Sequence, residues 1–80
     1  MTKILLFTAD WCTSCQALKQ NLGNELDSVE IANADAEPDM VIEANIRSIP
    51  TMIKYDDEGN EVSRQLGNMS KSSFIAWRDG

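Results

Sequence analysis

The sequence of 80 residues has no histidine and only two cysteines, Cys12 and Cys15. Zinc in proteins is held by four ligands drawn mainly from cysteine and histidine, so this chain could complete a zinc site only with carboxylates or with a second subunit. Two cysteines are also too few for the dense disulfide framework of a small secreted domain. We therefore expect neither a metal nor a scaffold of structural disulfides.

Positive charge and long apolar runs are also scarce. Seven Lys and Arg residues stand against 13 Asp and Glu residues, which gives a formal net charge of −6. Nucleic-acid binding normally needs clustered positive charge, so we expect no nucleic-acid partner; the acidity serves solubility or steers the protein toward basic partners. No apolar run approaches the length that spans a bilayer, so we expect no membrane association.

The composition that remains is typical of one globular domain. Hydrophobic residues make up 42% of the sequence, close to the usual share, so disorder is not expected. The length suits a single domain over residues 1–80, which we take to be a monomer. Met1–Lys3 runs directly into an apolar stretch without the cleavage region of a signal peptide, so the expected location is the reducing cytoplasm.

Hydrophobic patterning in the first half of the chain predicts strand, helix and strand in succession. Residues 3–8 form a continuous apolar run, which is typical of a strand buried on both faces in the middle of a sheet. Residues 29–34 predict a second strand, parallel to the first through a right-handed crossover. The helix between them is amphipathic, begins at the cysteine pair, and carries its apolar side on Cys15, Leu18, Leu22 and Leu26.

The rest of the chain predicts a short helix, a hairpin and a last helix. Acidic residues and Pro38 in the segment 35–39 are favoured in a first helical turn, and the short helix should end near Asn45. Turn-forming residues 56–60 separate two strand-like runs, which predicts an antiparallel hairpin. Ser70 is a suitable N-cap for the last helix. The two strands of the hairpin are predicted at 52–55 and 61–66. The last helix is predicted to run through Arg78, with Phe74 and Trp77 directed toward the core.

The two cysteines are separated by Thr13 and Ser14. A disulfide between them closes a very small ring, worth only about 2 kcal/mol against about 3 for a fifteen-residue loop, so a reversible bond is favoured over a structural one. Unpaired N–H groups and the helix dipole stabilise a thiolate at a helix N-terminus, which makes Cys12 the expected nucleophile and Cys15 the resolving thiol. Trp11 would place a flat apolar surface beside the sulfur. Half of a zinc site and two unreactive buried cysteines remain alternatives.

The order of the elements and three short motifs together resemble the thioredoxin superfamily over nearly the whole chain. The motifs are Ala-Asp-Trp-Cys-Thr-Ser-Cys at 9–15, Asn-Ile-Arg-Ser-Ile-Pro-Thr at 45–51, and Gly67 after the hairpin. The resemblance implies an α/β protein with a minimal thioredoxin fold: a four-stranded mixed sheet in the order β-α-β-α-β-β-α, with the middle helix on one face and the other two on the opposite face. The extra N-terminal strand and helix of ordinary thioredoxins are missing.

The resemblance also implies a substrate site. The Ile49–Pro50 bond is expected to be cis and to lie beside the cysteines, and the backbone of Ile49 is expected to pair with a segment of the substrate. Gly67 is expected to leave space for that segment. The predicted substrate-binding residues are therefore Trp11, Ile49, Pro50 and Gly67, beside the catalytic Cys12 and Cys15.

Two departures from the thioredoxin pattern affect the chemistry. Thioredoxins have Gly-Pro between their cysteines, whereas the Thr-Ser of this chain adds hydroxyl groups that can reach a thiolate; this predicts a potential less reducing than the value of about −270 mV typical of thioredoxin. The buried aspartate of thioredoxins falls on Leu6 and its lysine neighbour on Ile31. Cys15 would therefore lose its proton to water, to the leaving thiolate or to a carboxylate such as Asp10.

The resemblance implies a thiol–disulfide oxidoreductase that reduces disulfides in protein substrates and needs no bound cofactor. Thioredoxin reductase or glutathione would supply the electrons. One alternative is a glutaredoxin-like protein reset by glutathione, because glutaredoxins also lack the buried aspartate; their glycine pair followed by an acid is, however, not matched at 67–70. The other alternative is a binding subunit with a thioredoxin fold whose cysteines are incidental.

Overall fold

The computed structural model describes residues 3–80. Met1 and Thr2 lie outside the described residues. The expectation that the chain has no signal peptide was based in part on these two residues. Within the described part of the chain, no helix is both long and apolar enough to cross a membrane. The elements are, in order, β1 (Lys3–Thr8), α1 (Thr13–Leu22), the 3₁₀ helix η1 (Gly23–Ser28), β2 (Val29–Asn33), α2 (Pro38–Glu43), β3 (Thr51–Tyr55), β4 (Glu61–Leu66) and α3 (Lys71–Asp79).

The strands form one mixed sheet in the order β2-β1-β3-β4. β1 runs parallel to β2 and antiparallel to β3, and β4 completes the hairpin at the far edge. In the middle of the sheet, Leu6 of β1 lies between Ile31 of β2 and Met52 of β3. The central position explains the continuous apolar run of β1, because its residues from Ile4 to Thr8 are buried on both faces.

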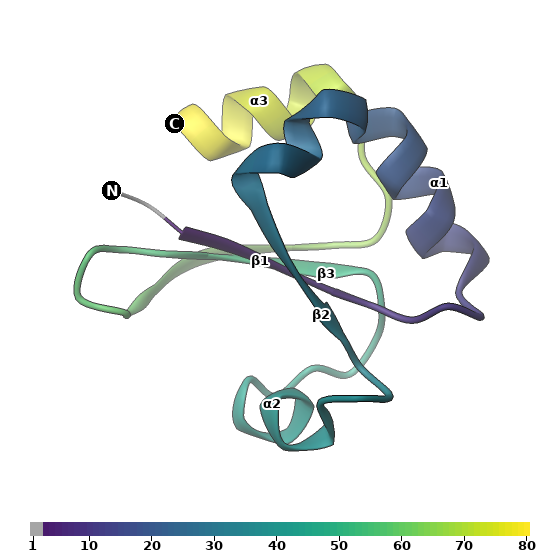
Figure 1. The fold of residues 1–80 in the computed structure, drawn as a ribbon. Coiled ribbons are helices and arrows are strands. Elements are labelled where there is room, and N and C mark those ends of the chain that lie inside the picture. Colours follow the sequence, from purple (N-terminus) through teal and green to yellow (C-terminus); the bar gives the residue numbers. More distant parts are fainter. Residues whose placement is uncertain (1–2) are drawn as a thin grey trace.

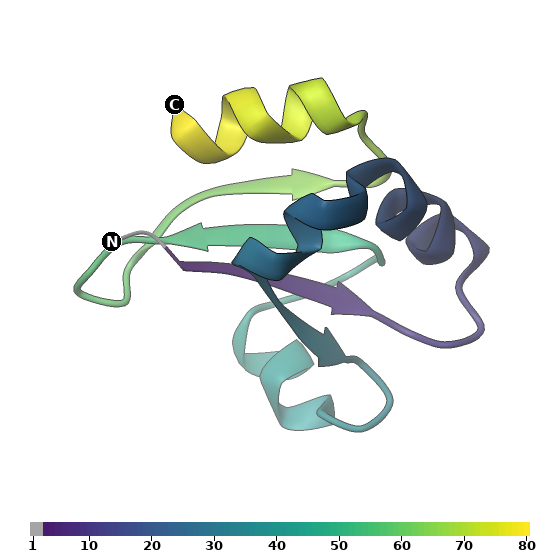
Figure 2. The same cartoon turned by 45° about the horizontal axis from the view of Figure 1, so that its top comes forward.

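Helices cover both faces of the sheet. α1, η1 and α3 lie on one side and α2 lies on the other (Figures 1 and 2). Side chains alternate along β1, so Ile4 and Leu6 enter the core beneath α1 and α3, whereas Leu5 and Phe7 enter the core beneath α2. The first core also contains Leu18, Leu22, Val29, Met52 and Phe74, and the second contains Ala32 and Ile53 with Met40 and Val41 packed against them. The minimal thioredoxin fold is confirmed.

The first helix is shorter than the apolar spacing predicted. α1 ends at Leu22, and the next six residues form the tighter η1. Gly23 has a φ of +53°, which L-residues with side chains rarely adopt, and its N–H donates to the carbonyl of Lys19 as a helix C-cap. Leu26 still packs against the core from η1. The spacing therefore predicted the buried side correctly but not the change of helix type.

The remaining elements begin and end within a few residues of their predicted bounds. α2 begins at Pro38, the first-turn position that suits proline, and the chain leaves it through Asn45, whose φ is +55°. β3 includes Thr51 as well as the predicted residues. Ser70 caps α3 by accepting the N–H of Ser73 at 3.2 Å. These caps and turns explain why the order of elements was recoverable from the sequence.

Lys54 is the one charged side chain among the buried residues of the described chain. It lies on β3 and is 5% exposed. Its Nζ donates to the carbonyl oxygens of Trp77 at 2.7 Å and Gly80 at 3.1 Å, and it lies 5.6 Å from the centroid of the Trp77 ring. A cation is favourable at a helix C-terminus, where carbonyl groups lack intrahelical partners. Lys54 therefore fastens the end of α3 to the sheet.

Replacing Lys54 by methionine should lower the free energy of unfolding by about 1–3 kcal/mol. Methionine keeps the apolar stem but loses the charge and the hydrogen bonds to α3. Urea unfolding followed by circular dichroism measures the effect. The control is Lys3→Met, because Lys3 is exposed and forms only a surface ion pair with Glu30 at 3.2 Å; such a change is expected to stay within about 0.5 kcal/mol. Equal losses in both variants would contradict the capping role of Lys54.

Candidate active site

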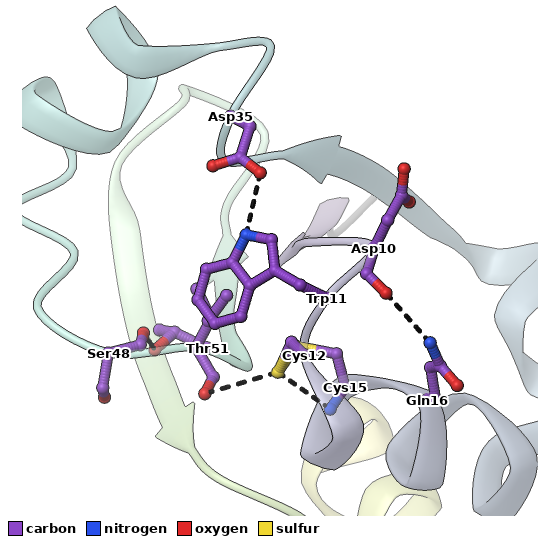
Figure 3. The surroundings of a disulfide bond; sticks show 9 residues. Asp10, Trp11, Cys12, Cys15, Gln16, Asp35, Ser48 and Thr51 are labelled. Atoms are coloured by element: carbon purple, nitrogen blue, oxygen red, sulfur yellow. Dashed lines mark hydrogen bonds between the residues drawn. A yellow bond between two sulfur atoms is a disulfide. The ribbon is translucent and has the colours of Figure 1, made fainter.

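The cysteine pair lies at the junction between β1 and α1. After β1 the chain turns so that the N–H of Cys12 donates to the carbonyl of Ala9 at 3.1 Å, and Cys12 becomes the N-cap of α1. The sulfur of Cys12 accepts the N–H of Cys15 at 3.1 Å. Cys12 and Cys15 are joined in a disulfide with their Cα atoms 5.2 Å apart (Figure 3). The short spacing in the sequence thus places both sulfurs at one helix end.

The two cysteines differ in their exposure to solvent. Cys12 is 6% exposed, whereas Cys15 is fully buried, so Cys12 is the more accessible residue of the pair. The first turn of α1 has no acidic side chain. The positive potential of the helix N-terminus therefore acts unopposed within that turn, and it favours a thiolate on Cys12 once the disulfide is reduced.

The segment before β3 forms the opposite wall of the site. The Ile49–Pro50 bond is cis, as the resemblance implied, and the Ile49 carbonyl oxygen lies 3.9 Å from Cys12 Sγ. The N–H of Gly67 donates to the carbonyl of the buried Pro50 at 2.9 Å. Gly67 has a φ of +84°, and no described residue fills the space that its Cβ would occupy. The structure thus brings Cys12, Ile49, Pro50 and Gly67 together from three separate segments.

Trp11 lies at the outer edge of the site and is 69% exposed. Its indole N–H donates to Oδ2 of Asp35 at 2.8 Å (Figure 3). Asp35 lies in the turn after β2, which Asn33 shapes by accepting the N–H groups of Asp35 and Ala36 at 2.9 and 3.3 Å. The sequence interpretation grouped Asp35 with the acids of a helix start, but α2 begins only at Pro38. Asp35 instead orients the indole, a pairing for which the sequence carries no local signal.

An Asp35→Ala variant should lower kcat/KM for protein disulfides by up to about fivefold. The Trp11 ring loses its hydrogen bond, worth about 1 kcal/mol at an exposed position, and its fixed orientation beside the disulfide. Steady-state reduction of a disulfide-containing protein measures the change. Asp39→Ala is the matched control, because Asp39 is an exposed acid of the α2 first turn. An unchanged kcat/KM in Asp35→Ala would show that the orientation of the indole is unimportant.

The surroundings of Cys15 lack the buried aspartate and its lysine neighbour that thioredoxins have there. Leu6, at the position of their buried aspartate, is fully buried in the first core, and Ile31 is 50% exposed on the edge strand. Asp10 is exposed and its carboxylate points away from the two sulfurs, while its backbone carbonyl accepts the side-chain N–H of Gln16 at 3.0 Å (Figure 3). Asp10 is therefore poorly oriented to take a proton from Cys15.

Within residues 3–80, no three His, Cys, Asp or Glu side chains are grouped to hold a metal ion.

An oxidised Cys-x-x-Cys pair at a helix N-terminus, facing a cis-proline on a four-stranded mixed sheet, defines a thiol–disulfide oxidoreductase with a thioredoxin fold. The sequence model of the Thioredoxin family matches residues 2–79. The chain therefore belongs to the thioredoxin family.

Individual relatives agree with this assignment. The thioredoxin of Chlamydia caviae is 38% identical over 74 residues, which cover 86% of this chain and 72% of that protein. The thiol:disulfide interchange protein TxlA of Synechococcus elongatus is 34% identical over 82 residues, which cover 91% of this chain but only 42% of that longer protein. The names of both relatives support thiol–disulfide oxidoreductase activity.

Solved structures support the fold. A malaria parasite thioredoxin-2 superimposes with a TM-score of 0.89 at 18% identity, covering 99% of this chain and 82% of that one. Mitochondrial thioredoxin 3 of Saccharomyces cerevisiae superimposes with a TM-score of 0.83 at 19% identity, covering 99% and 78%. At such low identity the likeness concerns the path of the backbone alone, which is the thioredoxin fold.

Proposed function

We propose that the protein reduces disulfides in other proteins, with Cys12 as the nucleophile and Cys15 as the resolving thiol. The observation that carries this assignment is the position of Cys12. It caps α1, its sulfur accepts the N–H of Cys15 at 3.1 Å, and it is the more exposed of the two cysteines. A thiolate on Cys12 would keep that hydrogen bond and gain the helix dipole, whereas Cys15 lies inside the first turn and is shielded from substrate.

The reaction proceeds in two exchanges. The Cys12 thiolate attacks one sulfur of the substrate disulfide, so an intermolecular disulfide forms and the other substrate sulfur leaves as a thiolate. Cys15 then attacks the sulfur of Cys12, the intermolecular bond breaks, and the second substrate sulfur leaves. The substrate gains two electrons and two protons, and the Cys12–Cys15 pair loses them. The disulfide in the structure is the product state of this half-cycle.

Four residues are proposed to hold the substrate around Cys12. The Ile49 carbonyl lies 3.9 Å from Cys12 Sγ, which is close enough for its backbone to pair with a substrate segment beside the attacked sulfur. Pro50 fixes this segment of backbone, and Gly67, bonded to the Pro50 carbonyl, leaves open space next to it. The exposed Trp11 ring supplies apolar contact on the outer side. Recognition through the backbone suits substrates of many sequences.

Membership of the thioredoxin family implies protein disulfide substrates and a reductase partner. We propose thioredoxin reductase as the electron donor, in the cytoplasm, because the relatives that the chain covers most fully are named thioredoxins. The alternative donor is glutathione. The prediction of a potential less reducing than about −270 mV follows from the Thr-Ser pair and is checked by redox titration.

The test compares two reducing systems with the same disulfide-containing protein. One contains NADPH and thioredoxin reductase, and the other contains NADPH, glutathione and glutathione reductase. Turnover with the first system is expected, and turnover with glutathione alone would make the protein glutaredoxin-like in its partner. A Cys12→Ser/Cys15→Ser double variant is the control. If it kept the protein's cellular function, the cysteines would be incidental and the protein a binding subunit.

A further inference from the structure

Thr8, the last residue of β1, carries a buried hydroxyl group without a partner. Its side chain is 3% exposed, and Oγ1 is the one buried side-chain nitrogen or oxygen in residues 3–80 that forms no hydrogen bond. Thr51 is equally buried, but its hydroxyl donates to the carbonyl of Ser48 at 2.7 Å. Buried hydroxyl groups are nearly always paired, because an unpaired one is destabilising. The unpaired Thr8 hydroxyl therefore requires an explanation.

The alternation of β1 directs Thr8 toward α1. Ile4 and Leu6 of β1 pack in the core beneath α1 and α3, and Thr8 continues their series at the end of the strand nearest the disulfide. Within the sheet, β1 pairs with β3, and Phe7 lies opposite Thr51. Because the two strands are antiparallel, the next residue of β1, Thr8, falls beside Pro50. Thr8 therefore lies beneath the start of α1 and next to the cis-proline segment.

The register of α1 places Cys15 above this position. α1 begins beyond the C-terminal end of β1 and runs back over the sheet (Figure 2). Its buried residues Cys15, Leu18 and Leu22 are separated by about 4.5 and 6 Å along the helix. Along β1, the residues on the same face, Thr8, Leu6 and Ile4, are spaced about 6.6 Å apart. Leu18 and Leu22 share a core with Ile4 and Leu6, the β1 residues that precede Thr8 on this face. Cys15, one turn earlier in α1, packs in a cluster with Ala9, the residue that follows Thr8. Cys15 therefore falls near the level of Thr8.

We propose that the Thr8 hydroxyl donates a hydrogen bond to the sulfur of Cys15 when the pair is reduced. In the oxidised structure the Thr8 hydroxyl has no partner, and neither sulfur of the disulfide carries a proton or a charge. Reduction turns Cys15 into a thiol or a thiolate, and a thiolate is a strong, charged acceptor. Thr8 would thus supply a polar group near Cys15 in a chain where Leu6 replaces the buried aspartate of thioredoxins. The inference rests on the proposed redox cycle of Cys12 and Cys15.

The hydroxyl stabilises charge and does not itself transfer the proton. Cys15 loses its proton to the departing substrate sulfur, and the Thr8 O–H donates to the thiolate that remains. The thiolate then attacks the sulfur of Cys12, which forms the intramolecular disulfide and releases the second substrate sulfur with its electron pair. Thr8 keeps its proton from beginning to end, so each exchange is balanced by thiol and disulfide alone.

A Thr8→Val variant tests the proposal through the redox equilibrium of the disulfide with reduced and oxidised glutathione. Valine has the shape of threonine but no hydroxyl, so it removes a bond that exists only in the reduced form. The dithiol should become about tenfold less favoured, which corresponds to a potential about 30 mV more negative. Thr8→Ser, which keeps the hydroxyl, should remain near the wild-type equilibrium.

Thr51→Val is the matched control. Its lost hydrogen bond to Ser48 does not involve either sulfur, so both redox forms should be destabilised alike and the equilibrium should not change. An unchanged equilibrium in Thr8→Val, or a Thr8→Ser variant that behaves like the valine variant, would overturn the proposal. If the wild-type disulfide does not equilibrate with glutathione at all, the failure lies in the proposed redox function and not in the role of Thr8.

Discussion

A Cys15→Ser variant is expected to accumulate covalent complexes with protein substrates, whereas a Cys12→Ser variant is expected to form none. In the first variant the Cys12 thiolate still attacks a substrate disulfide, but nothing follows to resolve the intermolecular bond. In the second variant the remaining thiol is fully buried and cannot reach a substrate. Both variants should lose turnover. Non-reducing electrophoresis and mass spectrometry of mixtures with a disulfide-containing protein measure the complexes.

The double variant Cys12→Ser/Cys15→Ser controls for non-covalent association. Complexes of Cys15→Ser must disappear on addition of dithiothreitol, and circular dichroism must show that each variant is folded. Complexes in Cys12→Ser but not in Cys15→Ser would reverse the assigned roles. Their absence from both variants would refute the two-step exchange.

Phe74→Ala is expected to lower the free energy of unfolding by about 3–5 kcal/mol. Phe74 is fully buried, packs with Leu6, Leu18 and Met52, and has the Trp77 ring at 6.2 Å between centroids. Truncation removes this contact area and leaves a cavity between α3 and the sheet. At about 0.05–0.15 kcal/mol per residue, a domain of this size has a total stability of about 4–12 kcal/mol. The Phe74→Ala change therefore removes a large share of the total stability. Urea unfolding measures this loss.

Ile42→Ala is the control for this prediction. Ile42 lies on α2 and is 76% exposed, so removing its side chain should alter the free energy of unfolding by no more than about 0.5 kcal/mol. A loss of less than about 1 kcal/mol in Phe74→Ala would mean that α3 contributes little to the core.

The sequence was sufficient for the order of the elements because each one has a local cause. The apolar run of β1, the three- and four-residue spacing that includes Leu18 and Leu22, and the turn residues 56–60 each depend on neighbours along the chain. Asp56 shows this directly, because its carboxylate accepts the N–H groups of Glu58 and Asn60 at 2.9 Å within the hairpin turn. Patterns of this kind can be recognised without knowing the fold.

Features that depend on distant segments were not predictable from pattern. Trp11 and Asp35 are 24 positions apart, and only the meeting of the β1 and β2 ends brings them within 2.8 Å. Lys54 would be expected on the surface for its charge, yet it is buried because the carbonyls of α3 offer it partners. The unpaired hydroxyl of Thr8 likewise has meaning only once α1 lies above it.

The candidate site falls between these cases. The spacing of Cys12 and Cys15 predicted a reactive pair at a helix start through elementary electrostatics, and the structure places them there. Ile49 and Gly67 lie 37 and 55 positions beyond Cys12, and only resemblance to a known fold connected them with the cysteines. Their convergence follows from the central place of β1, since β3 and the segment after β4 meet beside its end.

The two ends of the described chain lie far from the disulfide. β1 begins and α3 ends at one side of the sheet, while the junction between β1 and α1 lies at the opposite side (Figures 1 and 2). A second domain, a purification tag or a surface linker joined at either end would therefore leave the face that carries the disulfide uncovered. The protein is suited for this reason to immobilisation on a bead or electrode as a reusable reductant, with its active face directed outward.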